Sequence, residues 1–222
     1  MTDALINING DNVETLDIII TLTILSLIPS ILMLTTCFAR LIIVMSILKN
    51  ALGLQNTPPN MVLVGIALFL TLFIMNPVIT DINENAYQPY KDGEITQIEA
   101  IEKAEVPMKE FMLKQTKSET LAMYLDFSGE ELPDVEAEYT TLPMTVVIPA
   151  YITCELSRAF VMGFFIYLPF LLIDLVVSST LMSMGMMMLP PSMISMPFKI
   201  LLFVVVDGWS KTFSTLIQSF NM

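Results

Sequence analysis

The sequence contains no histidine, only 10 lysines and arginines, and two cysteines among 222 residues. Without histidine, the most common zinc ligand and the usual general base near neutral pH are absent, so an enzyme is a poor first hypothesis. The few basic residues, set against 22 acids, argue against nucleic acid as a partner, because phosphate binding needs clustered Lys and Arg. Cys37 and Cys154 have no metal-ligand or redox spacing, and we expect two free, buried thiols and no cofactor.

Charged residues are also scarce, at 14%, whereas hydrophobic residues make up 55% of the chain. Soluble domains average about 25% charged residues, so this composition predicts a membrane protein. The charges are concentrated: residues 81–139 contain 15 acids and 5 lysines. We therefore divide the chain into an acidic tail (1–17), a first apolar helical hairpin (18–80), an acidic helical insert (81–143) and a second apolar helical hairpin with a Met-rich tip (144–222).

Four apolar segments have the composition of membrane helices: 18–48, 61–79, 149–177 and 193–206. The first two are strong candidates, and the first predicts one continuous helix. The last two carry charges that make them poor lone spans in lipid. The acidic tail and a weak Lys and Arg bias predict that the tail and the insert lie outside the cytoplasm. We predict an all-α protein of two long helical hairpins and a small helical insert, without a sheet.

Both hairpins contain a glycine followed five residues later by two prolines: Gly53 with Pro58 and Pro59, and Gly185 with Pro190 and Pro191. Paired prolines cannot continue a helix, so both motifs predict hairpin turns. Within the insert, Thr96 and Glu99 match a capping box and predict the start of a helix.

Five charged side chains lie inside the apolar segments and need partners: Arg40, Glu155, Arg158, Asp174 and Lys199. Glu155 and Arg158 are three residues apart and can pair on one helical face. Asp174 lies at a depth similar to that of Lys199 and could reach it within the hairpin. Glu155 lies about 30 Å farther along its helix, so a contact with Lys199 would have to cross subunits. We favour this Glu155–Lys199 contact between subunits.

Two other functions fit the intramembrane charges less well. An aspartyl protease would use Asp174 and Asp207, but neither lies in a Gly-Xaa-Gly-Asp motif, and Asp207 beside Trp209 fits interfacial anchoring better. A proton-coupled secondary transporter would use acids and lysines near the bilayer midplane as a relay. Four segments are few for a transporter, which remains our alternative hypothesis.

Eighteen methionines are present, with a cluster between Met182 and Met188 at the second hairpin turn. Methionine side chains are flexible and polarizable, so they fill irregular spaces. The cluster therefore predicts either ordinary adaptable packing or a soft apolar seal.

Several stretches together resemble the FliP family of flagellar export-gate proteins: 40–53, 58–60, 69–77, 149–151, 155–156, 170–176, 185–188 and 203–209. Injectisome homologues share much of this pattern, but residues 58–60 and 86–89 look more flagellar. The resemblance covers nearly the whole chain.

This resemblance implies a non-enzymatic, pore-forming subunit of the flagellar type III export gate in the bacterial inner membrane, at the flagellar basal body. It implies a homo-oligomer, a pentamer in the family, that assembles with FliQ-type and FliR-type membrane subunits and passes unfolded flagellar proteins. Met186, Met187 and Met188 would then form the gasket of the closed gate. The sequence contains no Gly-rich phosphate loop, so we expect no nucleotide site in this chain.

Overall fold

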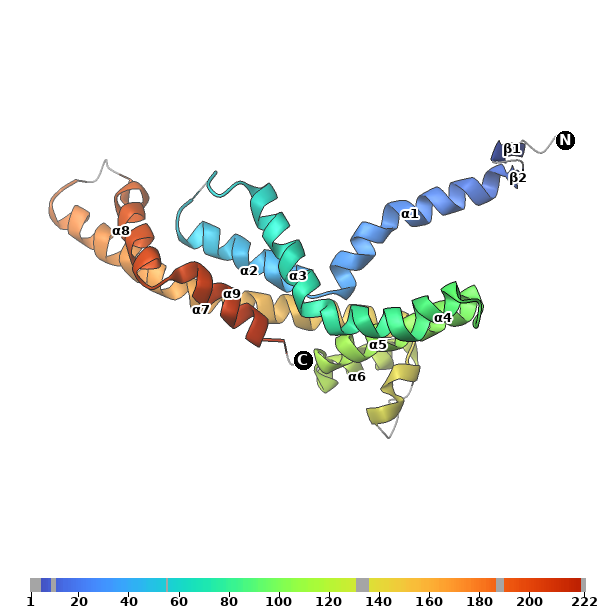
Figure 1. The fold of residues 1–222 in the computed structure, drawn as a ribbon. Helices are drawn as coiled ribbons and strands as arrows, with labels where there is room; N and C mark the ends of the chain where they lie inside the picture. The colour runs from blue at the N-terminus through green and yellow to red at the C-terminus, as the bar shows by residue number, and fades with distance from the viewer. Residues whose placement is uncertain (1–4, 9–10, 55, 131–135, 187–189, 221–222) are drawn as a thin grey trace.

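The computed structural model describes residues 5–8, 11–54, 56–130, 136–186 and 190–220 (Figure 1). Over these residues the chain is almost entirely helical, which confirms the predicted all-α class. The elements are β1 (Leu5–Ile8), β2 (Asp11–Glu14), α1 (Thr15–Thr35), α2 (Phe38–Ala51), α3 (Asn60–Ile82), η1 (Asn83–Tyr87), α4 (Gln88–Lys91), α5 (Gln97–Lys114), α6 (Ser118–Ser128), η2 (Glu136–Thr141), α7 (Met144–Ser183), α8 (Pro191–Val205) and α9 (Gly208–Gln218). The antiparallel β1–β2 hairpin corrects our expectation that no sheet is present.

The first apolar segment forms two helices, so the prediction of one continuous helix over 18–48 is wrong. The helix stops at Thr35, and α2 begins at Phe38. The Thr36 hydroxyl donates to the Leu32 carbonyl at 2.6 Å and lies 3.4 Å from the backbone nitrogen of Phe38. Short polar side chains of this kind compete with helical hydrogen bonds, and α1 leaves the body of the molecule at this break (Figure 1).

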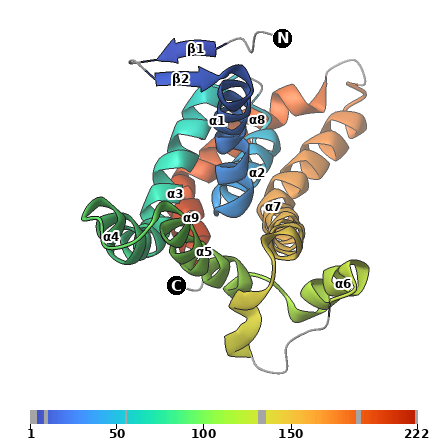
Figure 2. The ribbon, with the colours of Figure 1, turned by 90° about the vertical axis from the view of Figure 1, so that its right-hand side faces the viewer.

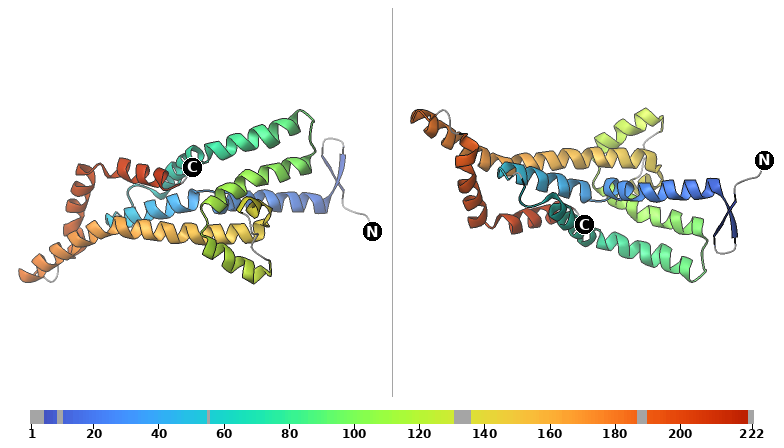
Figure 3. Two further views of the ribbon diagram at one scale, coloured as in Figure 1. Left: turned by 90° about the horizontal axis from the view of Figure 1, so that it is seen from below. Right: turned by 90° about the horizontal axis from the view of Figure 1, so that it is seen from above.

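The main hydrophobic core lies where α2 packs between α3 and α7. Gly163 permits the close approach of α7 to α2, because a Cβ at this position would lie 2.4 Å from Cδ1 of Ile47. Fully buried side chains of α2 and α7, including Leu41 and Tyr151, fill this contact. At 40 residues, α7 runs along most of the molecule. Helix α8 packs against α7, and α9 follows α8 and runs at a distance from α7 (Figure 3).

The acidic insert packs on the outer parts of α3 and α7 (Figure 2). Helix α3 continues through the π-helical turn η1 into α4, and α5 returns beside it. The predicted capping box is present: Thr96 Oγ1 accepts from the backbone N–H of Glu99 at 3.3 Å, and the Thr96 N–H donates to Glu99 Oε2 at 2.7 Å. A local signal in the sequence therefore sets the start of α5.

Both glycines of the hairpin motifs have positive φ, +76° at Gly53 and +74° at Gly185, a conformation that favours glycine. Pro59 precedes the first residue of α3, and Pro190 precedes the first residue of α8. After the second hairpin turn, the chain bends by 64° between α8 and α9, at Val206 and Asp207. Within the described ranges, three helices are long and apolar enough to cross a membrane, and α8 with α9 would make a fourth if this bent pair counts as one span.

Candidate functional site

Arg40 is the centre of the most elaborate polar cluster in the described chain. Helix α2 carries it on its core-facing side, where the side chain is 0% exposed. Its Nε donates to Glu155 Oε2 at 2.8 Å, and its Nη2 contacts Glu155 Oε1 and Gln115 Oε1. Its Nη1 donates to the carbonyl and hydroxyl oxygens of Ser219, at 3.0 and 2.9 Å. Every nitrogen of the guanidinium group therefore has a partner.

The Phe220 ring completes the enclosure of Arg40, with its centroid 3.7 Å from Cζ. Arginine over an aromatic face is attracted by the ring quadrupole, and the attraction is stronger away from water. We call Arg40, its contacts and the neighbouring Arg158, which donates to Gln115, the Arg40 cluster. It consists of Arg40, Gln115, Glu155, Arg158, Ser219 and Phe220. It joins α2, α7, the end of α5 and the segment after α9.

Glu155 on α7 is also 0% exposed and therefore depends on its pairing with Arg40. Removing a carboxylate from water costs on the order of several kcal/mol. A charged partner and further hydrogen bonds can offset this cost. Arg158, one turn later, lies 3.7 Å from Glu155 Oε1. Its closer contacts are with the Gln115 carbonyl at 2.6 Å and the Gln115 side chain at 3.1 Å.

A second polar cluster lies near the two hairpin turns. Lys199 on α8 is 4% exposed, and its Nζ lies 2.6 Å from Asp174 Oδ2 on α7. The same Nζ donates to the carbonyl of Ala51, the last residue of α2, at 3.0 Å. Ser195 donates to the other Asp174 oxygen at 2.6 Å. This Lys199 cluster, made of Ala51, Asp174, Ser195 and Lys199, connects the first hairpin to the second.

The structure thus brings the five predicted charged residues into two separate groups. Lys199 pairs within the chain with Asp174, the alternative to the Glu155–Lys199 contact that the sequence analysis favours. Glu155 pairs with Arg40, so neither Glu155 nor Lys199 contacts the other in the described chain. Their contact between subunits stays a prediction.

Sequence reasoning missed Gln115, Ser195, Ser219 and Phe220. Polar and aromatic residues of these types occur throughout the sequence, and no local pattern marks these four.

Only one of the three predicted gasket residues can be located. Met186 is 42% exposed beside Gly185, whereas Met187 and Met188 lie outside the described residues. Met182 and Met184 nearby are 64% and 71% exposed. Methionines near this turn are therefore open to their surroundings in the single chain.

Cys37 and Cys154 are both free and buried.

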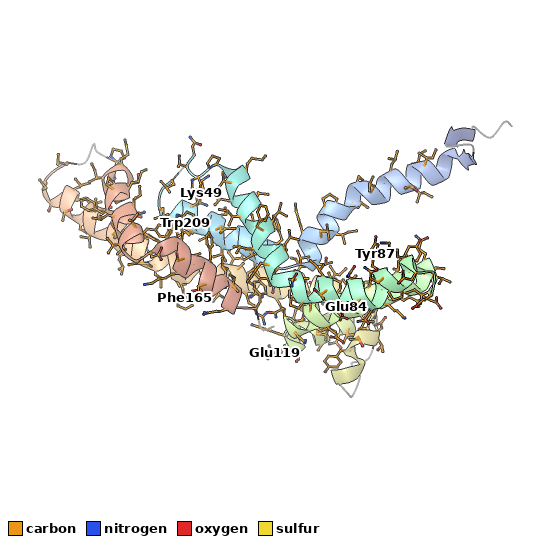
Figure 4. The ribbon with its side chains drawn as sticks, viewed as in Figure 1. Lys49, Glu84, Tyr87, Glu119, Phe165 and Trp209 are labelled. Atoms are coloured by element: carbon orange, nitrogen blue, oxygen red, sulfur yellow. The ribbon has the colours of Figure 1, made fainter. Side chains whose placement is uncertain are left out.

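Large apolar side chains cover much of the outer surface. Helix α7 exposes Phe160, Phe164, Phe165, Leu172 and Val176, and α8 exposes Leu201, Val204 and Val205. Phe165 on α7 and Trp209 on α9 can be located in Figure 4. Five charged side chains of the two hairpins are buried or partly buried in the two clusters described above, and a sixth, Lys49, is buried and donates to Asn60 Oδ1 at 2.8 Å. Asp207 and Lys211 are exposed. Apolar groups outside and paired charges inside are the reverse of the arrangement in a soluble domain.

Among the residues that the structure describes, no three His, Cys, Asp or Glu side chains come together in a group that could hold a metal ion. The fold and these clusters define a helical, membrane-associated protein whose internal charges join its helices to one another.

Comparison with known proteins identifies the family. A model of the FliP family matches residues 21–216. "Flagellar biosynthetic protein FliP" of Bacillus subtilis is 50% identical over 207 residues, which cover 93% of this chain and 92% of the relative. The proteins of the same name from Pectobacterium carotovorum and Aquifex aeolicus are each 46% identical, over 96% of this chain and over 82% and 88% of their own lengths. The chain belongs to the FliP family.

Proposed function

We propose that this chain is a pore-forming core subunit of the flagellar protein export gate in the bacterial inner membrane. Family membership and the flagellar names of its relatives support the flagellar role. The observation that carries the proposal furthest is the exposed apolar surface of α7 and α8, because apolar helices that hold most of their charges inside suit a subunit covered by lipid and by other subunits. Its role is structural and conductive, with no enzymatic step.

The partners that we propose are further copies of this chain, five in all, together with FliQ-type and FliR-type membrane subunits. Unfolded flagellar proteins would pass through the enclosed channel. The acidic insert, residues 81–143, would lie on the extracytoplasmic side. No observation favours the proton-coupled transporter.

The function is tested by removing the chain from its host bacterium and restoring it from a plasmid. We expect the deletion to abolish secretion of flagellar hook and filament proteins and to leave growth unchanged. Restoring the chain should return both secretion and motility. The proposal is wrong if the deletion strain still secretes these proteins at the parental level.

We further propose that Met186, Met187 and Met188 form the gasket of the closed gate. Several turns around one axis would bring these flexible side chains together, and a soft apolar constriction excludes water while adapting to passing chains. Replacing the three residues with alanine should raise small-solute leakage through a fully assembled complex. Packing alone would instead predict weaker assembly with unchanged leakage.

The Glu155–Lys199 contact between subunits is the remaining proposal about the site. Within the chain, Glu155 pairs with Arg40, and Lys199 pairs with Asp174. A contact between subunits would require both residues to leave these partners. The test reverses both charges together, Glu155→Lys with Lys199→Glu. Assembly that recovers no better than in the single variants would exclude this contact.

A further inference from the structure

Lys49 is a buried cation that has no acidic partner within the described chain. It lies in the last turn of α2 and is 7% exposed. Its Nζ donates to Asn60 Oδ1 at 2.8 Å, and it forms no ion pair with any described residue. The carbonyl end of a helix favours a lysine, but this effect is small beside the cost of removing an ammonium group from water. Lys49 therefore needs an anion from outside the described chain.

The ammonium group of Lys49 lies where such an anion can reach it. Asn60, which holds it, is the first residue of α3 and is exposed. The amide oxygen of Asn60 satisfies one of the three donors of an ammonium group, which leaves others for a second acceptor. A carboxylate arriving beside Asn60 would complete the site without displacing a helix.

Asp207 is the complementary group, a carboxylate without a partner. It lies between α8 and α9 and is exposed. Among the described residues it is the only one other than glycine with positive φ, at +51°. Aspartate at the start of a helix commonly accepts hydrogen bonds from the first N–H groups, but the Asp207 side chain makes no such bond to α9 and forms no ion pair in the described chain. Its carboxylate is therefore available to another molecule.

The surroundings of Asp207 make a lone carboxylate unfavourable. Val204, Val205 and Val206 precede it and are 68%, 73% and 38% exposed. A carboxylate beside an apolar surface that lipid or protein covers needs a cation. Lys211, one turn later on α9, is exposed and forms no ion pair with Asp207 in the described chain. The acid is thus left for a cation of another molecule.

Lys49 and Asp207 lie at the same level of the molecule. Trp209, two residues after Asp207, packs on the buried group that includes Leu48, the residue before Lys49. Figure 4 shows Lys49 and Trp209 at a similar place along the length of the molecule. Head-to-tail contacts between identical copies join two different surfaces of one chain. Copies that stand side by side at similar heights would therefore bring these two charges together.

We propose that the Asp207 carboxylate of one copy pairs with the Lys49 ammonium group of a neighbouring copy. The group that occupies the Lys49 site is then the bend between α8 and α9 of the second copy. The contact joins the first hairpin of one subunit to the second hairpin of the next. This proposal rests on the homo-oligomer of the proposed function.

Complementation between two charge variants tests the pair and shows whether it forms between copies. Copies with Lys49→Glu and copies with Asp207→Lys are produced separately and together, and the assembled complex is measured by size-exclusion chromatography in one detergent. Produced alone, each variant places like charges at every contact, so we expect about tenfold less complex than the wild-type chain gives. Produced together, each variant supplies the charge that the other lacks, and assembly should recover to about half of the wild-type amount or more.

A pair within one chain predicts no recovery on joint production, because each variant chain still carries two like charges. A lipid phosphate as the partner of Lys49 also predicts no recovery, since a change at Asp207 would not restore it. Absence of recovery would therefore overturn the proposal, and so would single variants that assemble as well as the wild-type chain. The matched control is Lys211→Glu, which reverses an exposed charge on α9 and should leave assembly unchanged.

Neutral substitutions keep the test decisive if a charge-reversed chain fails to fold, as judged by helix content in circular dichroism. Lys49→Met and Asp207→Asn should each weaken assembly, and the double variant should be no worse than the weaker single variant. Losses that multiply in the double variant would overturn the pair. A wild-type chain that remains a monomer would reject the homo-oligomer and with it this contact, whereas a wild-type oligomer that is indifferent to both charges would reject this contact alone.

Discussion

The Arg40–Glu155 pair is expected to show strong energetic coupling. Both side chains are fully buried, so replacing either one leaves the other charge in the core with its main partner gone. Breaking a buried pair in this way costs about 3–5 kcal/mol. For a chain of this size each kcal/mol lowers the unfolding midpoint by about 2–4 °C, so Arg40→Met and Glu155→Leu should each lower it by about 6–20 °C.

The double variant should be less damaged than the sum of the two single variants. With both charges replaced by apolar groups, no charge remains buried alone, and the coupling energy should be about 2–3 kcal/mol. Part of the loss will persist, because Arg40→Met also removes the contacts with Ser219 and Phe220.

The assay follows the fluorescence of the single tryptophan, Trp209, during heating of the purified protein at one detergent concentration and one heating rate. The exposed Lys211 provides a control, because Lys211→Met should shift stability by no more than about 0.5 kcal/mol. If the midpoint of the double variant falls by the sum of the single shifts, the two side chains are not coupled and our reasoning about the cluster is wrong.

Three further predictions concern single positions. Gly208→Ala should destabilise the protein by about 1–3 kcal/mol, seen as a lower unfolding midpoint, because the new methyl group would overlap the Phe203 ring; an unchanged midpoint would mean that the ring moves freely. Gly185→Ala should cost about 1–2 kcal/mol through backbone strain alone, since φ is +74° and no atom lies within 4 Å of the added Cβ. Hydrogen bonds from Thr96, the backbone N–H first, lower the pKa of Glu99 below 4.5. The stability that this carboxylate contributes is therefore present above about pH 4.5 and is lost as the pH falls through the lowered value, so Glu99→Gln should flatten the acid dependence of helix content, measured by circular dichroism.

Local signals in the sequence predicted some of the local structure and missed other parts. The Thr96–Glu99 capping box begins α5 because both hydrogen bonds join residues three apart. The break after Thr35 was missed because residues 35–37 are Thr-Thr-Cys, which do not interrupt an apolar segment, although both threonine hydroxyls donate to backbone carbonyls. The β1–β2 hairpin was missed although its strands flank Asn9-Gly10, the dipeptide most typical of tight hairpins.

The charged clusters were predictable in kind, and Asp174 was recognised as within reach of Lys199, but the partners of Arg40 were not predictable. The cost of burial in an apolar segment shows that Arg40, Glu155 and Lys199 need partners. It does not show which partners, because Arg40 and Glu155 are 115 residues apart, and Arg40 and Ser219 are 179 residues apart. Only the three-dimensional crossing of α2, α7 and the segment after α9 selects these contacts.

The length of α7 has a consequence for how the protein meets a bilayer. Forty helical residues extend about 60 Å, whereas the hydrocarbon interior is about 30 Å thick. An upright α7 would leave half of its length outside the hydrocarbon, and complete immersion would need an inclination of roughly 60° from the membrane normal, beyond the common range of tilts. The exposed phenylalanines and leucines of α7 lie between Leu156 and Leu175, about 30 Å of helix, which is one hydrocarbon thickness. Most of the buried residues of α7 lie in its first half, and α7 packs against α2, α5 and α6. The part of α7 that exceeds the bilayer is thus the part that the chain's own helices cover.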